Sequence, residues 1–186
     1  VEQAVLRALG GEHFHHLLDL GTGTGRMIAL LGQSASQVSA IDRSPDMLRL
    51  ARAKLPQENA DKVDLLLGDF CALPLEDAAV DLITAHQILH YSATPHLAVA
   101  EAARVLQPLG RLLIVDFAPH DREELRSRDQ HERLGFSDEQ IGEWFAEAGL
   151  ELEQTDTLPG GELTVKLWLG RRQTAKILPI RERKTS

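Results

Sequence analysis

The chain has 186 residues, 43% of them hydrophobic and 26% charged, which is enough for one domain whose core needs no disulfide or metal to hold it. The single cysteine, Cys71, excludes a disulfide framework and predicts a reducing compartment, the cytoplasm. The net charge of −8 disfavours nucleic-acid binding by this segment, and a membrane span is not expected because no apolar run approaches ~20 residues.

Short apolar runs alternate with amphipathic stretches along the first half of the chain. Strands are predicted over residues 16–20, 37–42, 63–67 and 79–85. A helix is predicted over residues 25–31. Ser44 and Pro45 then supply the N-cap and first residue of another helix. That helix is expected to bury one face, made by Met47, Leu48, Ala51 and Leu55.

The second half continues the alternation. Thr94 and Pro95 open a helix that ends before Pro108, and a strand is predicted over residues 111–117. The expected buried face of the helix consists of Leu97, Ala98, Ala102, Val105 and Leu106. Ser137 and Gln140 form a capping pattern for a helix that Gly149 ends. Strands over 150–157 and 163–169 are joined by a hairpin signal at residues 159–161.

This alternation predicts an α/β fold, a mostly parallel sheet with helices on both faces and a closing antiparallel strand. One domain is expected over residues 1–170. Residues 171–186 carry six basic residues against the single acid Glu182 and are predicted to be a flexible basic tail. Only about 16 residues precede the first strand, room for one short helix and no substrate lid.

A glycine-rich turn lies where the first strand passes into the first helix. Its glycines are Gly21, Gly23 and Gly25, a place where open α/β sheets bind ligands. The dinucleotide pattern G-x-G-x-x-G requires a third glycine at position 26, and Arg26 stands there. The spacing therefore disfavours an NAD-dependent reductase.

Two acidic residues follow the next two strands. Asp42 ends the second strand and can accept hydrogen bonds from both hydroxyls of a ribose, although alone it reads equally well as a charge at a helix N-terminus. Gly68-Asp69-Phe70 ends the third strand and is a plain turn when taken alone. Together with the glycine turn, these residues favour a nucleoside ligand, with Asp69 on the exocyclic amine of adenine and Phe70 on its face.

The segments LDLGTGTG, AID, GDF, DLITAHQILHY and LLIVDF, in this order, resemble a class I S-adenosylmethionine-dependent methyltransferase. The resemblance covers residues 17–169 and implies a seven-stranded Rossmann-like sheet in the order 3-2-1-4-5-7-6, with strand 7 antiparallel. It also implies S-adenosyl-L-methionine as cofactor. The residues it assigns are Asp19, Gly21, Thr22, Gly23 and Gly25 for the methionine portion, Asp42 for the ribose, Arg43, Met47, Asp69 and Phe70 for the adenosine, and His86 and Gln87 beside them.

A narrower resemblance is carried by RLLIVDFAPHDREELR, HERLGFSDEQI and LTVKLWLGRR. These segments are similar to the methyltransferase half of bacterial fusions that begin with an ArsR-type winged-helix repressor. That resemblance, and the absence of an initial methionine, lead us to expect an N-terminal winged-helix domain upstream of this chain. One departure is Leu109, where such proteins usually have glycine, and it puts the local backbone geometry in doubt. Arsenite methyltransferases are a poorer match, because they need several cysteines.

The stretch after the fourth strand contains the candidate catalytic residues His86, His90 and Tyr91. If it is helical, His86 and His90 share a face, yet no third ligand is evident and no metal is expected. A general base and packing against cofactor or substrate both remain open for these residues. His120 and His131 bracket a charged segment after the fifth strand, which can lie across the acceptor pocket in this fold or be a solvated helix. We favour an enzyme that transfers the methyl group to a small-molecule acceptor, because His86, His90 and Tyr91 would leave polar groups near the expected methyl position. The alternative is cofactor sensing for an attached DNA-binding domain. The sequence specifies neither the acceptor nor the oligomeric state.

Overall fold

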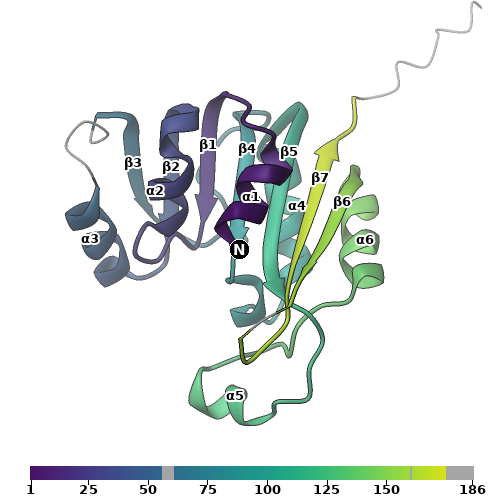
Figure 1. Ribbon diagram of the computed structural model, residues 1–186. Helices are drawn as coiled ribbons and strands as arrows, with labels where there is room; N and C mark the ends of the chain where they lie inside the picture. The colour runs from purple at the N-terminus through teal and green to yellow at the C-terminus, as the bar shows by residue number, and fades with distance from the viewer. Residues whose placement is uncertain (56–60, 160, 175–186) are drawn as a thin grey trace, which may run out of the picture.

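The computed structural model describes residues 1–55, 61–159 and 161–174 of the chain. They form a seven-stranded sheet in the order β3-β2-β1-β4-β5-β7-β6, as predicted (Figure 1). The strands are β1 Phe14–Leu20, β2 Ala35–Asp42, β3 Val63–Leu67, β4 Val80–His86, β5 Leu106–Phe117, β6 Leu150–Leu158 and β7 Val165–Arg172. Strands β1 to β5 pair in parallel, whereas β7 is antiparallel to both β5 and β6.

Helices cover both faces of this sheet. Their bounds are α1 Glu2–Leu9, α2 Arg26–Leu31, α3 Pro45–Lys54, α4 Pro95–Val105, α5 Glu124–Arg128 and α6 Asp138–Glu147, with short 3-10 turns η1 Gly32–Ser34 and η3 Leu89–Tyr91. α1 and α2 pack on one face and α4 and α6 on the other, each pair with its own apolar core. The segment that carries α5 projects from the edge where β5 ends (Figure 1). The carboxyl ends of β1 to β5 therefore share one edge, and the β6–β7 turn lies there too.

Local chemistry explains where several elements begin and end. The Ser44 hydroxyl accepts a hydrogen bond from the Met47 backbone N–H, and the Ser137 hydroxyl accepts one from that of Gln140. Each serine thereby satisfies an N–H group that the first helical turn leaves free. Gly149 follows α6 in the left-handed region, at φ +74°. The predicted caps and the predicted stop after α6 are confirmed.

Some sequence expectations differ from the structure at the edges of elements. Leu97 is 46% exposed, because the buried face of α4 is centred on the alanines and valines that flank it. Of the predicted face of α3 only Ala51 is fully buried, since α3 lies against β2 and the edge strand β3. β5 starts at Leu106 rather than Arg111, and β7 runs on to Arg172. The predicted boundary at residue 170 therefore falls inside β7, and most of the basic tail, residues 175–186, lies outside the described residues.

The predicted hairpin at residues 159–161 includes Gly160, which lies outside the described residues. Within the part of the chain that the structure describes, no helix is both long enough and apolar enough to cross a membrane.

Candidate functional site

The glycine turn between β1 and α2 has a backbone that side chains with a Cβ rarely adopt. Gly21, Gly23 and Gly25 have φ angles of +60°, +53° and +84°. A Cβ on Gly21 would also lie 2.4 Å from the Ile88 side chain. The turn is tied to the next strand, because the Thr22 backbone N–H donates to the Ile41 carbonyl at 3.0 Å. These positions require glycine, and the chain passes close to the edge of the sheet.

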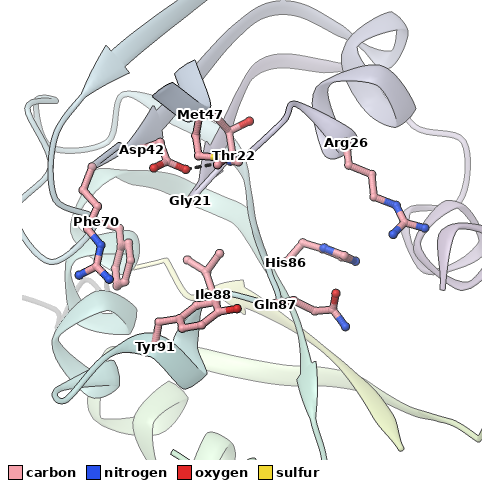
Figure 2. Close-up of a pocket in the computed structure, with 12 residues that line it drawn as sticks. Gly21, Thr22, Arg26, Asp42, Met47, Phe70, His86, Gln87, Ile88 and Tyr91 are labelled. Carbon is pink, nitrogen blue, oxygen red and sulfur yellow. Dashed lines mark hydrogen bonds between the residues drawn. The ribbon is translucent and has the colours of Figure 1, made fainter. Parts of the chain in front are cut away.

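Asp42, the last residue of β2, is fixed against this turn. Its Oδ2 accepts a hydrogen bond from the Gly23 backbone N–H at 2.8 Å (Figure 2). Its Oδ1 accepts one from the Ser44 backbone N–H at 2.8 Å. A carboxylate has about four lone-pair positions, so each oxygen can accept a further hydrogen bond. Asp42 thus presents a held, half-buried carboxylate to the space above the sheet.

A cavity of about 480 Å³ lies above this edge. Its lining residues are Gly21, Thr22, Gly23, Arg26, Asp42, Arg43, Met47, Phe70, His86, Gln87, Ile88 and Tyr91. Thr22, Asp42 and Met47 lie on one side, with Ile88 and Tyr91 opposite them (Figure 2). Its size is within the range of small-molecule sites, and its lining combines polar and apolar side chains.

Three residues predicted to bind cofactor do not line this cavity. Asp19 is buried beneath the glycine turn, where its Oδ1 accepts a hydrogen bond from the Thr84 hydroxyl at 2.6 Å. Burial raises the pKa of Asp19 to about 6. Gly25 begins α2 behind the turn. Asp69 is exposed, and its Oδ1 accepts a hydrogen bond from the Cys71 backbone N–H at 2.8 Å. In the structure all three shape the turns around the cavity.

Two lining residues were not predicted as site residues. Arg26 follows the glycines directly and pairs with Glu2 of α1 at 2.9 Å. Its position next to the motif was a signal that sequence reasoning could have used. Ile88 supplies part of the apolar wall against Gly21. An isoleucine after a strand carries no such signal.

The stretch after β4 is not a continuous helix. His86 ends the strand, and His90 lies in η3, so the two rings do not share a helix face. Gln87 between them has φ +53°, an unfavourable backbone for a residue with a Cβ, and its N–H donates to the Val115 carbonyl at 2.7 Å. His86 lines the cavity, and burial lowers its pKa. This bend turns Gln87 and Ile88 toward the cavity (Figure 2).

His90 lies behind the cavity wall, in contact with Asp116 near the end of β5. Its Nδ1 is 2.7 Å from Asp116 Oδ1, and both side chains are almost completely buried. Asp116 Oδ2 also accepts a hydrogen bond from the Leu89 backbone N–H at 3.0 Å. The His90 ring packs on Tyr91, with ring centroids 4.0 Å apart. The pair therefore anchors η3, and with it Tyr91, to the sheet.

The described ranges contain no group of three histidine, cysteine, aspartate or glutamate side chains placed to hold a metal ion.

Comparisons with known proteins agree with this geometry. Residues 18–114 match the family described as "Methyltransferase domain". The uncharacterized methyltransferase Rv3342 of Mycobacterium tuberculosis is 38% identical over 150 residues, which is 81% of this chain and 54% of that protein. The malonyl-[acyl-carrier protein] O-methyltransferase of Methylococcus capsulatus is 38% identical over 112 residues, 59% of this chain and 40% of that protein.

The fold has solved counterparts as well. The structure of YcgJ from Bacillus subtilis superposes with a TM-score of 0.80 at 19% identity, over 93% of this chain and 98% of that one. The chain belongs to the S-adenosylmethionine-dependent methyltransferases, and S-adenosylmethionine is the cofactor of that family. It spans about half the length or less of the curated relatives named here.

Proposed function

We propose that this domain binds S-adenosylmethionine in the cavity above β1, β2 and β4 and transfers its methyl group to a small-molecule acceptor. The observation that carries the proposal is Asp42, which the Gly23 and Ser44 N–H groups hold at the cavity wall with lone pairs to spare. A carboxylate held in this way is suited to accept hydrogen bonds from the two hydroxyls of a ribose.

The remaining lining residues fit the rest of the cofactor. Met47, Phe70 and Ile88 offer apolar surface for a purine ring, and Arg43 lies beside them in the lining. The backbone of Gly21, Thr22 and Gly23 would hold the methionine portion, because the turn brings main chain to the cavity without a Cβ in the way. Asp19, Gly25 and Asp69 would act through the turns that they stabilise.

The bound cofactor would supply a methyl group already activated by a sulfonium, with the electron pair of the broken carbon–sulfur bond returning to sulfur. The protein has to align a nucleophile and exclude water. His86 and Tyr91 line the cavity and would contact the reacting groups. Burial keeps the pKa of His86 below its usual value, so the ring is neutral at pH 7. His90 would act as a positioning residue, through its packing on Tyr91.

Two measurements test this function. Calorimetry with S-adenosylmethionine should show binding that weakens in Asp42→Ala. Incubation with a methyl-labelled cofactor and a metabolite extract should then give a labelled small molecule with the wild type and much less with Asp42→Ala. Absence of binding would contradict the proposal at its first step.

Tight binding without any labelled product would instead favour the sensing alternative, which uses the same cavity. No contact among the described residues favours that alternative. The attached winged-helix domain and the cytoplasmic location stay predictions from the sequence.

A further inference from the structure

A second cavity, of about 310 Å³, lies next to the first. Gln87 lines both. The floor of the second cavity is apolar and consists of Phe117, Leu125, Leu163 and Val165, while His131 forms a polar part of its wall. Because the two cavities share Gln87 in their walls, a molecule in the second cavity would lie next to a molecule bound in the first.

Three segments far apart in sequence build this second cavity. Phe117 and Val165 face each other across β5 and β7, which brings the β6–β7 turn to the end of β5. The chain after α5 is fastened to η3, because the backbone N–H groups of Glu132 and Arg133 donate to the His90 carbonyl at 2.9 and 3.0 Å. His131 is therefore held over His90, with ring centroids 4.3 Å apart. The site is built by backbone hydrogen bonds rather than by loosely placed side chains.

The charged groups at the rim of the second cavity pair with one another. Arg128 is paired with Asp129 at 2.8 Å and lies 3.6 Å from Glu162, and Arg122 also pairs with Glu162 at 2.6 Å. Two carboxylates therefore balance two arginines, and both arginines are already engaged. A carboxylate or phosphate group would have to compete with these carboxylates for a cation, so the rim disfavours anionic molecules.

The His131 ring is held in the cavity wall by contact with a fixed neighbour. The Asp116 carboxylate accepts a hydrogen bond from His90 Nδ1, and the His90 ring lies against that of His131. Within the described chain, His131 Nδ1 is buried and lacks a hydrogen-bond partner. Burial lowers the pKa of His131, so its ring is neutral at pH 7 and one of its two nitrogens has a lone pair.

We propose that the second cavity is the acceptor site of the transfer inferred above. It would take an uncharged molecule with an apolar ring and a hydroxyl on that ring. The hydroxyl oxygen would form a bond to the methyl carbon as the carbon–sulfur bond of the cofactor breaks, and the hydroxyl proton would pass to the ring nitrogen of His131 that has a lone pair. Asp116 and His90 are positioning residues in this proposal, because they act on the His131 ring and not on the acceptor. The proposal rests on the proposed function for the identity of the neighbouring ligand, but its own residues can be tested separately.

The first experiment measures binding of phenol and benzoate, two probes of similar size and different charge, by NMR titration of the isotope-labelled protein. We expect phenol to bind at least about tenfold more tightly than benzoate. Leu163→Trp should fill the cavity and weaken phenol binding by about tenfold or more. The control is Leu152→Trp, which makes the same change at an exposed position of β6 outside both cavities and should leave phenol binding unchanged.

Calorimetry with S-adenosylhomocysteine, the demethylated cofactor, keeps the two proposals apart. Leu163→Trp should bind it as the wild type does, which also shows that the variant is folded. If the wild type failed to bind S-adenosylhomocysteine, the proposed function would fall, whereas the phenol titration alone judges the second cavity. Equal phenol binding by wild type and Leu163→Trp, no phenol binding by the wild type, or benzoate binding as tight as that of phenol would each overturn the acceptor site.

The second experiment follows the proton, with 4-nitrophenol as probe, because its ionised form absorbs visible light. The bound probe should ionise at lower pH in the wild type than in His131→Gln, since His131 accepts its proton in the wild type. His131→Gln should retain probe binding. His120→Gln is the control from the same ring cluster, and it should leave the ionisation of the bound probe as in the wild type. The charged and titratable groups around His131 are Arg128, Asp129 and Glu162 on the rim and His90, Tyr91, Asp116 and His120 near its ring.

The apolar lining sharpens this readout. Without His131 it should push ionisation of the bound probe to higher pH than in the wild type, because burial disfavours the charged form. An unchanged ionisation curve in His131→Gln would show that His131 does not accept the proton.

Discussion

At the scale of single residues, Asp42 is the side chain on which ligand binding is expected to depend most. Asp42→Ala removes both acceptors for a ribose and should weaken S-adenosylmethionine binding by about 1–3 kcal/mol, the range for charge-assisted hydrogen bonds. Calorimetry measures this directly. Asp46→Ala is the matched control, since Asp46 is an exposed carboxylate on α3 outside the cavity lining. Equal affinities of wild type and Asp42→Ala would mean that the ribose assignment is wrong.

Asp19 gives a second prediction at this scale, because its pKa is raised by burial to about 6. The Thr84 hydrogen bond opposes the effect of burial and is outweighed. A carboxyl with a raised pKa favours the folded state at low pH, and this contribution is lost as pH rises through the folded pKa. From pH 4 to pH 7 the loss should reach about 3 kcal/mol, because each tenfold difference in proton affinity between the folded and unfolded states is worth about 1.4 kcal/mol.

Asn at this position is neutral at every pH and can still accept from Thr84. Between pH 4 and pH 7 the unfolding free energy of Asp19→Asn should therefore rise relative to that of the wild type. Urea denaturation at each pH measures both. Parallel curves for the two proteins would contradict the raised pKa. The comparison uses the slope of the unfolding free energy against pH. A constant change in stability caused by the substitution itself therefore does not affect it.

At the scale of elements, the start of β5 contains a strained residue. Leu109 has φ +67° and is 56% exposed. A residue with a Cβ loses about 1–2 kcal/mol of stability in the left-handed region. Glycine avoids this loss, but it costs about 0.5–1 kcal/mol because it loses more conformational entropy on folding. Leu109→Gly should therefore raise the unfolding free energy by roughly 0.5–1 kcal/mol.

Denaturant unfolding measures that gain, and Leu67→Gly is its control. Leu67 is 62% exposed and lies in the regular strand β3, so replacement by glycine should destabilise the protein by roughly 0.5–1 kcal/mol. If both substitutions destabilised equally, the strain at Leu109 would not be real.

The elements also show where sequence reasoning succeeds. Apolar periodicity and caps locate all seven strands and most helix ends, because burial and capping act within a few residues. The sequence pattern predicts buried positions for Leu97 and Met47, and both are exposed. Which face of α3 or α4 is buried depends on elements distant in sequence that pack against it. The bend at Gln87 was missed, because its unfavourable φ is imposed by contacts with β5.

At the scale of the whole molecule, the two cavities differ in how far the sequence could predict them. The first is lined largely by motifs that each follow a strand end, so parallel pairing brings them together. The second joins the end of β5, the α5 segment and the β6–β7 turn, and the long contact between His90 and His131 spans 41 residues of sequence. No local pattern specifies that contact, which depends on the hydrogen bonds from the backbone N–H groups of Glu132 and Arg133 to the His90 carbonyl.

This architecture makes ligand binding in the first cavity depend on four neighbouring strands, which leads to a last prediction. Ligand groups in the first cavity would meet turns after β1, β2, β3 and β4, so a ligand that binds there should stabilise the folded state as a unit. At S-adenosylhomocysteine 100 times its dissociation constant, the unfolding free energy should rise by about 2.7 kcal/mol. At the same concentration Asp42→Ala should gain much less, because its dissociation constant is larger. Thermal denaturation with and without ligand measures both, and an equal gain in the two proteins would show that the ligand is bound elsewhere.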